Sequence, residues 1–354
     1  MNRTRTRLSP ALMALAAATL LSACDRAPET EQLQFQAFGT LVEVTVAPAG
    51  EHDLAKIERE MQAELDILHA SWHAWEEGSL GRTNQLLPLK REFSAPPSVL
   101  PLIEQGRAVE QATDGLFNPA LGQLIAAWGF HQDEPAGPPP DDDTLAELLD
   151  DPPSMQDIER SGVRLTGRHP DLQLDFGGLA KGTAVERTRD QLDDLGVEAA
   201  IVNAGGDLMT LGRPAGRDWK VGIRHPDGGT LGGIELGGGE GLFTSGDYER
   251  GYEHEGERIH HVIDPRTGRP AEGIRSATVL HDEGGLADAA ATTLMIAGPE
   301  EWPEYAERLG IDHALVVLAD GRIEATPAMA ERVEIGDRHP EPEIREWPEG
   351  DTAP

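Results

Sequence analysis

An aspartate and a threonine four positions apart are the clearest candidate metal ligands. Asp288 and Thr292 lie in an alanine-rich stretch, where a helix would project both side chains from one face about one turn apart. Carboxylate and hydroxyl oxygens are hard donors that suit Mg²⁺ and suit zinc poorly. Spacing alone favours a structural alternative, with an aspartate stabilised by the helix dipole and a threonine packed in the helix.

Reactive side chains also gather in residues 244–250 (TSGDYER) and 260–268 (HHVIDPRTG). His261 is a candidate general base, because imidazole titrates near neutral pH, and Asp264 is a candidate partner to orient it. The two adjacent histidines could instead bind a transition metal, but no third His or Cys stands at convincing zinc spacing. A merely structural role for the histidine pair is equally compatible with the sequence.

Two glycine turns follow expected strands. Residues 175–182 (DFGGLAKG) lead into an expected helix, with Lys181 near its start, which would bring backbone groups and a cation close to an anionic ligand. The spacing is not that of a Walker loop. Residues 203–207 (NAGGD) would allow a similarly close backbone approach. In both segments a purely steric need for glycine explains the pattern about as well.

A scaffold of short strands and helices must position these residues. Apolar residues recur at helical spacing over 54–68, which predicts an amphipathic helix. Residues 136–143 are expected to form a surface loop. The mixture predicts an α+β fold with mixed sheets flanked by helices. Further helices are expected over 98–112, 120–130, 181–195 and 287–297, and strands over 38–46, 172–176, 199–203, 219–223, 233–236, 277–281, 314–319 and 321–325.

The composition excludes one class of partner. The formal net charge is −33. Binding to nucleic-acid phosphates needs the opposite sign, so we expect no nucleic-acid partner. Only four lysines occur, and an acidic, lysine-poor surface is often a solubility adaptation of salt-loving organisms.

The two ends of the chain differ from the middle. Residues 1–23 have a basic start and a short apolar run, which is typical of a cleaved signal peptide. Cys24, the only cysteine, follows small residues as in a bacterial lipobox, although an ordinary signal peptide with an incidental cysteine is the alternative. We expect residues 24–34 to be a lipidated tether, 35–335 the catalytic domain, and 336–354 a poorly ordered acidic, Pro-rich tail. The location expected from this is the cell envelope, with a lipid anchor on the periplasmic face of the inner membrane.

Taken in order, five motifs resemble the ApbE family of FAD:protein FMN transferases. They are LDFGGLAKG, NAGGDL, TSGDYER, HHVIDPRTGRPA and ADAAATT, and the resemblance extends from about residue 35 to 320. It implies an ApbE-like architecture and the Mg²⁺-dependent transfer of FMN from FAD to a Thr or Ser of a target protein. An exported flavoprotein or a membrane redox-pump subunit is the acceptor that the family suggests.

The resemblance also implies roles for individual residues. Asp288, Thr292 and the backbone carbonyl of Gly178 match metal ligands, and His261 matches the catalytic histidine. Three binding positions differ from the common pattern of the family. Phe38 stands where Met is common, Trp75 where Tyr is common and Asn118 where Asp is frequent. The residues expected to bind the flavin nucleotide are Phe38, Trp75, Leu116, Phe117, Asn118, Asp175, Lys181, Ser245 and Val262.

Two other functions fit the same residues. One is a Mg²⁺-dependent FAD pyrophosphatase that gives free FMN and AMP, with water as the acceptor. The other is a non-catalytic lipoprotein that stores or delivers FAD. Asp288, Thr292 and His261 speak against the second, because a carrier needs no base.

Overall fold

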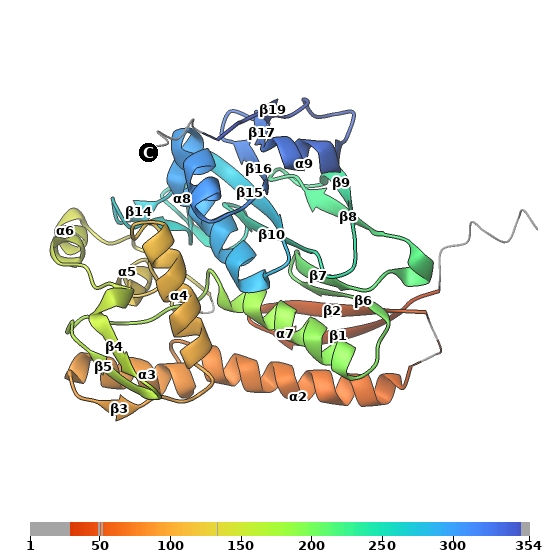
Figure 1. Ribbon diagram of the computed structural model, residues 1–354. Coiled ribbons are helices and arrows are strands. Elements are labelled where there is room, and N and C mark those ends of the chain that lie inside the picture. The colour runs from red at the N-terminus through yellow and green to blue at the C-terminus, as the bar shows by residue number, and fades with distance from the viewer. Residues whose placement is uncertain (1–28, 49, 51, 133, 348–354) are drawn as a thin grey trace, which may run out of the picture.

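A nine-stranded sheet forms the centre of the molecule (Figure 1). The structure is a computed structural model and describes residues 29–347 apart from residues 49, 51 and 133. Neighbouring strands are antiparallel except for the parallel pair at the β17–β19 edge. In spatial order the strands are β1 (Glu31–Ala37), β2 (Thr40–Ala47), β6 (Ala199–Ala204), β7 (Asp207–Leu211), β10 (Gly241–Gly246), β15 (Ile274–His281), β16 (His313–Leu318), β17 (Ile323–Ala325) and β19 (Glu343–Ile344).

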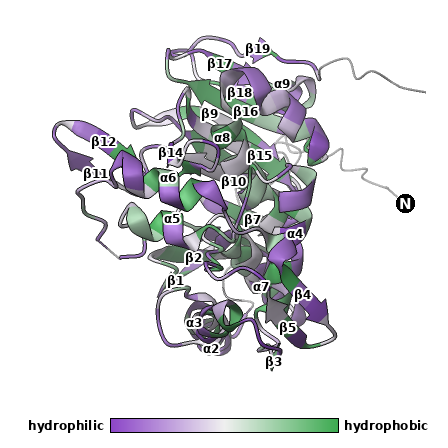
Figure 2. Ribbon diagram, turned by 90° about the vertical axis from the view of Figure 1, so that its left-hand side faces the viewer, coloured by the Kyte–Doolittle hydropathy of each residue, from purple (hydrophilic) through white to green (hydrophobic). Residues whose placement is uncertain are grey.

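The two faces of this sheet are buried against different partners. Helices α2 (Leu54–Trp72), α7 (Ala180–Asp194) and α8 (Gly284–Arg308) pack on one face, and a small sheet of β8, β9 and β18 packs on the other. Successive residues of a strand point to opposite faces, so Met209 contributes to the core on the helical side and Leu208 to the core on the other side. Figure 2 shows how hydrophobic residues concentrate in the central strands and α8. The expected α+β class is confirmed.

The remaining elements surround this centre. The β11–β12 hairpin projects from the body of the molecule (Figure 2). The other helices are α3 (Ser79–Leu86), η1 (Leu87–Leu89), α4 (Leu100–Ala112), α5 (Gly122–Ala127), α6 (Asp142–Asp150), η2 (Met155–Asp157), η3 (Pro214–Gly216) and α9 (Pro327–Arg332). The other strands are β3 (Phe93–Ser94), β4 (Ile158–Ser161), β5 (Arg164–Gly167), β8 (Trp219–Arg224), β9 (Thr230–Leu236), β11 (Gly251–His254), β12 (Glu257–His260), β13 (Ile263–Asp264), β14 (Arg269–Pro270) and β18 (Val333–Ile335).

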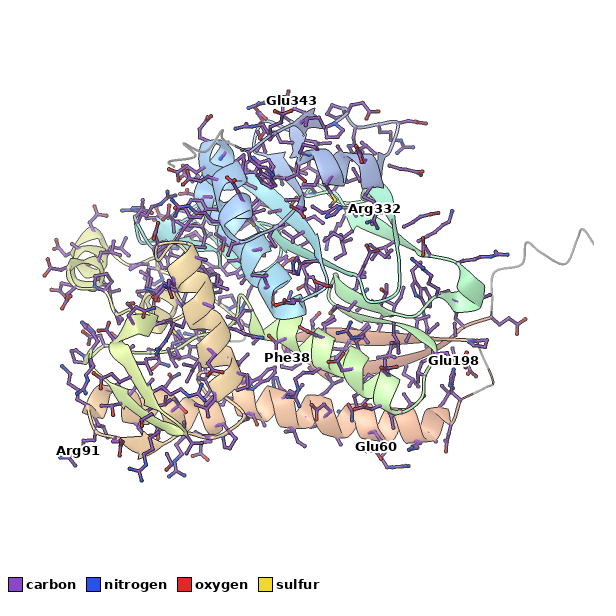
Figure 3. All side chains as sticks on the ribbon, in the orientation of Figure 1. Phe38, Glu60, Arg91, Glu198, Arg332 and Glu343 are labelled. Atoms are coloured by element: carbon purple, nitrogen blue, oxygen red, sulfur yellow. The ribbon has the colours of Figure 1, made fainter. Side chains whose placement is uncertain are left out.

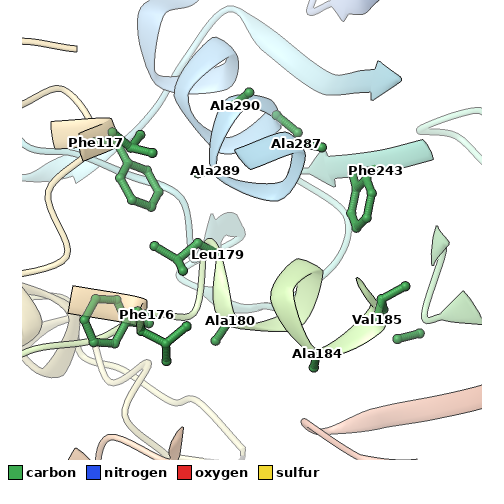
Figure 4. Close-up of a cluster of buried hydrophobic side chains, with 14 of the residues drawn as sticks. Phe117, Phe176, Leu179, Ala180, Ala184, Val185, Phe243, Ala287, Ala289 and Ala290 are labelled. Carbon is green, nitrogen blue, oxygen red and sulfur yellow. The ribbon is translucent and has the colours of Figure 1, made fainter. Parts of the chain in front are cut away.

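Helices α7 and α8 approach each other closely at their first turns. A Cβ atom on Gly182 would lie 2.1 Å from the carbonyl oxygen of Gly284, so only glycine allows this backbone contact. Small residues continue the packing, with Ala180 and Ala184 on α7 and Ala287 on α8 all buried (Figure 4). The contact matters because it brings the first turn of α7 beside the carboxylate of Asp288.

The prediction of a strand at 172–176 is wrong. Only an isolated bridge between Gln173 and Leu121 forms there. Asn84 takes the place of a neighbouring strand, because its side chain accepts from the Leu174 amide at 2.8 Å and donates to the Leu174 carbonyl at 2.9 Å. A side chain from a distant helix therefore satisfies backbone groups that a period-two pattern had assigned to a sheet.

Both boundary expectations need correction. Residues 31–34, which were expected to be part of the tether, belong to β1, which pairs with β2. The tail expected to be poorly ordered contains β19, which pairs with β17, and its Trp347 packs against the main core. Residues 1–23 and Cys24 lie outside the described residues.

The other expected elements are found with shifted ends. Helix α5 covers only part of the range 120–130, and α6 begins at Asp142, inside the expected loop. The expectation of a helix over 54–68 is confirmed, since α2 extends to Trp72. Strands β1, β7 and β10 were not expected, although two of them carry site residues.

Candidate functional site

The proposed metal ligands meet where α8 faces the turn before α7. Asp288 is 4% exposed and its Oδ2 accepts a hydrogen bond from the Gly182 amide at 2.8 Å. Thr292 Oγ1 lies 3.0 Å from Ser245 Oγ at the end of β10. A Cβ on Gly178 would lie 3.4 Å from Thr292 Oγ1, which places the Gly178 backbone beside the threonine. The structure thus brings all three residues together.

This set of donors fits a hard divalent cation. It offers one carboxylate, one hydroxyl and one backbone carbonyl, which are the oxygen ligands Mg²⁺ prefers. Burial raises the pKa of Asp288, and the nearby charge of Asp207 raises it further, so the carboxylate stands where a bound cation would be favourable. Within the described part of the chain no group of three or more His, Cys, Asp or Glu residues is arranged to hold a metal.

A lysine and two further carboxylates adjoin the metal ligands. Lys181 Nζ lies 2.5 Å from Asp207 Oδ2, at the start of β7. Asp207 is almost fully buried, whereas Glu249, which follows β10, is exposed. The pKa of Lys181 is raised: desolvation opposes the charge, but attraction by Asp207, Asp288 and Glu249 outweighs it. We call Gly178, Lys181, Asp207, Asp288 and Thr292 the charged end of the site.

His261 follows the β11–β12 hairpin. Its Nδ1 lies 3.2 Å from the Arg250 carbonyl oxygen, which can only accept, so Nδ1 carries the proton and Nε2 keeps its lone pair. Burial lowers the pKa of His261, and the positive charges of His260 and Lys181 lower it further. The ring is therefore neutral at neutral pH, as a general base must be.

Asp264 does not orient His261. Both of its carboxylate oxygens accept hydrogen bonds from the Arg266 side chain, and Arg266 also donates to the Ile296 carbonyl and to Glu301. This network holds the β13–β14 turn against α8. The carbonyl of Arg250, a backbone group that residue types alone cannot reveal, has the orienting role that the sequence suggested for Asp264.

Aromatic side chains contact Asp175 and the end of α2. Trp75 Nε1 donates to Asp175 Oδ2 at 2.9 Å, and the Trp75 ring lies 5.6 Å from the His131 ring. Phe38 has a φ of 53° in the β1–β2 turn, and its amide donates to His69 Nδ1 at 3.2 Å. Phe38, which is labelled in Figure 3, borders the same small gap as Leu65 of α2 and Ala184 of α7. We call Phe38, Trp75 and His131 the aromatic end of the site.

Asp175 connects the two ends. Its Oδ2 accepts from Trp75, and its Oδ1 accepts from the Gly177 amide at 2.8 Å, one residue before the metal-site glycine. The contact of Asp175 with the flavin nucleotide stays a prediction.

Residues 116–118 and Val262 also belong to the predicted binding region. Leu116, Phe117 and Val262 are buried, and the Phe117 ring lies against Gly178 (Figure 4). Asn118 uses its side chain internally, since Nδ2 donates to the Pro153 carbonyl and Oδ1 accepts from the Ala120 amide. These contacts fix the shape of the loop.

Sequence reasoning did not assign three residues of this arrangement. Asp207 and Glu249 stand in the NAGGDL and TSGDYER motifs, but only the fold shows that both face Lys181. His131 follows the Trp-Gly-Phe stretch and carried no signal of its own. Among the described residues no helix is long and apolar enough to cross a membrane.

The fold and site together define an α+β protein in which candidate oxygen ligands for a cation lie beside a lysine. A sequence model described as the ApbE family matches residues 38–315. Because that match covers most of the chain, this protein belongs to the ApbE family.

Relatives of named activity agree with this assignment. The chain is 39% identical over 328 residues to an FAD:protein FMN transferase of Rhodobacter capsulatus, covering 91% of this chain but only 62% of that protein's length. It is 30% identical over 317 residues to the FAD:protein FMN transferase of Salmonella typhimurium, covering 84% of this chain and 89% of the relative.

Solved structures extend the likeness to the fold. The crystal structure of an ApbE protein from Thermotoga maritima superposes with a TM-score of 0.79 at 27% identity, covering 86% of this chain and 99% of that one. The apo form of the Pseudomonas stutzeri flavinyl transferase ApbE gives a TM-score of 0.76 at 29% identity, with 88% and 99% coverage.

Proposed function

We propose that this protein is an Mg²⁺-dependent FAD:protein FMN transferase that attaches FMN to a Thr or Ser hydroxyl of another protein and releases AMP. The observation that carries the proposal is the convergence of Gly178, Asp288 and Thr292 beside Lys181, within a fold that also supplies a neutral His261. The names of the relatives give the same activity.

The reaction exchanges the phosphoanhydride linkage of FAD for a phosphoester linkage to the acceptor. The acceptor oxygen forms a bond to the FMN phosphorus, and the bond from that phosphorus to the bridging diphosphate oxygen breaks, so that AMP leaves with the electron pair. His261 Nε2 takes the proton of the acceptor hydroxyl, while the Arg250 carbonyl holds the ring through Nδ1. The base and the phosphate-binding residues must be held in a fixed relation for this step.

The enzyme must also neutralise the negative charge of the FAD diphosphate. Gly178, Asp288 and Thr292 would hold Mg²⁺, which supplies positive charge to phosphate oxygens when bound. Lys181 adds a fixed cation next to these ligands, and its raised pKa keeps it charged over the working pH range. The Trp75 and Phe38 rings offer apolar surface for a flavin or adenine ring.

Intact-mass analysis of an acceptor tests this proposal against the two other functions. An exported flavoprotein domain with a threonine acceptor is incubated with this protein, FAD and Mg²⁺, with and without EDTA. A gain of one FMN that EDTA abolishes supports the transferase. Free FMN and AMP without acceptor modification would indicate a pyrophosphatase, and bound but intact FAD would indicate a carrier.

The place of action forms part of the proposal. The lipobox-like sequence ending in Cys24 supports a lipid anchor in the cell envelope, on the periplasmic face of the inner membrane. Acceptors would then be exported flavoproteins or membrane redox-pump subunits. Incorporation of a labelled fatty acid, lost in a Cys24→Ala variant, tests the anchor.

A further inference from the structure

One ion pair at the charged end stands apart from the other lysine contacts of the protein. The chain has four lysines, and Lys56, Lys90 and Lys220 are exposed. The Lys181 side chain is 22% exposed, and its Nζ lies 2.5 Å from a carboxylate that is almost fully buried. A flexible lysine side chain loses considerable conformational freedom when it is held in this way.

Asp207 is fixed from a second direction. Its Oδ1 accepts a hydrogen bond from the Thr244 amide at 2.8 Å, while Oδ2 faces Lys181. Thr244 precedes Ser245, whose hydroxyl contacts the metal-site residue Thr292. One carboxylate therefore connects the first turn of α7 with the end of β10, the two segments that flank the proposed metal ligands.

We propose that Asp207 is a positioning residue that fixes the Lys181 ammonium relative to the metal ligands, and that this placement is needed in the transition state of transfer. The inference rests on the proposed function, because it assumes that Lys181 acts on the substrate diphosphate. Asp207 itself need not touch the substrate.

The neighbouring charges explain why Asp207 has this role and other acids do not. The charged groups facing Lys181 are Asp207 on β7, Asp288 on α8, Glu249 after β10 and, when protonated, His261. Asp288 accepts a hydrogen bond from the Gly182 amide. Glu249 is exposed and attracts Lys181 through its charge. Only Asp207 combines burial, contact with Lys181 and a hydrogen bond to β10 among the residues that the structure describes.

The discriminating variant is Asp207→Asn, which keeps an oxygen to accept from the Thr244 amide and removes the charge. We expect kcat for FMN transfer to fall roughly 10- to 100-fold, because a small misplacement of a charge costs most in the transition state. The Kd for FAD, measured by flavin fluorescence in the presence of Mg²⁺, should change by no more than about threefold, since Lys181 remains free to follow the ground-state phosphate.

A double-variant cycle separates positioning from a structural role. In a Lys181→Met background, Asp207→Asn should lower kcat by less than about twofold, because there is no ammonium left to position. Glu249→Gln, assayed above the pKa of Glu249, which desolvation raises to about 7, is the matched control, since it removes a nearby charge without breaking the contact. An unchanged kcat in Asp207→Asn, or an equal loss in both backgrounds, would overturn the proposal.

A second readout needs no turnover. An ammonium group held in an ion pair exchanges its protons slowly with water, so ¹⁵N-labelled lysine should give one protected ammonium signal, assigned by its loss in Lys181→Met. The signal should disappear in Asp207→Asn and persist in Glu249→Gln. A missing signal in the unaltered protein refutes the held lysine, whereas a present signal with no FMN transfer refutes the proposed function and leaves the ion pair intact.

Discussion

The charged end and the aromatic end of the site are held in different ways. At the charged end, Asp288 accepts from Gly182, Asp207 from Thr244, and Thr292 contacts Ser245, so each functional side chain is fixed by another regular element. At the aromatic end, Phe38 lies in a turn and Trp75 in a loop after α2. The Phe38 amide donates to His69, and the only hydrogen bond of the Trp75 indole among the described residues is to Asp175. The comparison indicates that the residues proposed to face the diphosphate are held rigidly. The residues proposed to bind the rings are held less firmly and can adapt.

If this contrast is correct, the largest effect comes from the metal ligand. Asp288→Asn keeps an acceptor for the Gly182 amide but loses the charge that attracts the cation. We expect transfer to fall about 1,000-fold or more at any Mg²⁺ concentration, because the cation supplies several kcal/mol of transition-state stabilisation. Rates measured over a Mg²⁺ series, with thermal unfolding as a folding control, check this. More than a tenth of the normal rate would contradict the assignment.

The next effect concerns the base. His261→Ala should lower kcat about 100-fold or more and leave FAD affinity within about threefold, since a base acts on the acceptor and not on FAD. Single-turnover transfer and FAD titration measure the two quantities.

Asp264→Asn sharpens this test. Because Asp264 bonds Arg266 and not His261, its loss should lower thermal stability while kcat stays near normal. A kcat loss equal to that of His261→Ala would restore Asp264 as the orienting residue.

A smaller effect is expected at the aromatic end. Trp75→Phe keeps an aromatic ring but removes the hydrogen bond to Asp175. Since the pair is only partly buried, we expect the Kd for FAD to rise only about fivefold, with kcat nearly unchanged. Fluorescence titration of FAD checks the affinity. A loss of kcat as large as that of Asp288→Asn would show that the two ends are not built differently.

The smallest effect is in the pH profile. The pKa of His261 is lowered by burial and by neighbouring positive charge, so the neutral base persists as the pH falls through 6.5. At saturating Mg²⁺ we expect kcat to change less than about twofold between pH 8 and 6. A pH–rate profile with an acidic midpoint near 6.5 would refute this.

The same pKa shift has a consequence for folding. Because the unfolded chain binds a proton at His261 more readily than the folded chain, this residue makes stability fall as the pH drops below 6.5. Urea unfolding at several pH values, compared with His261→Ala, isolates the contribution.

The features of the fold that local sequence patterns encode were predicted correctly. The spacing of Asp288 and Thr292, the amphipathic α2 and the α7 helix after a glycine turn all follow from periodicity and turn chemistry. The contact of Lys181 with Asp207 could not be predicted, because it joins α7 to β7 through the packing of the helix on the sheet. The replacement of a strand partner by Asn84 at Leu174 likewise leaves no periodic signal.

The site residues divide in the same way. Residues that act through side-chain type, such as Asp288 and His261, were identified from sequence and family resemblance. The group that orients His261 is a backbone carbonyl, and every residue has one, so composition and spacing carry no information about it. Asp264 looked suitable by type and proximity, but Arg266 lies closer along the chain and pairs with it.

The short parallel strand β19 covers the β17 edge of the main sheet and so hinders association with other molecules. Without β19, the β17 edge of the main sheet would expose unpaired backbone groups, a template on which other chains can add strands. Glu324, which is 1% exposed, would also lose the Arg345 guanidinium that neutralises it beside Trp302. Truncation before residue 343 should therefore leave the site residues in place and yet produce a protein that aggregates.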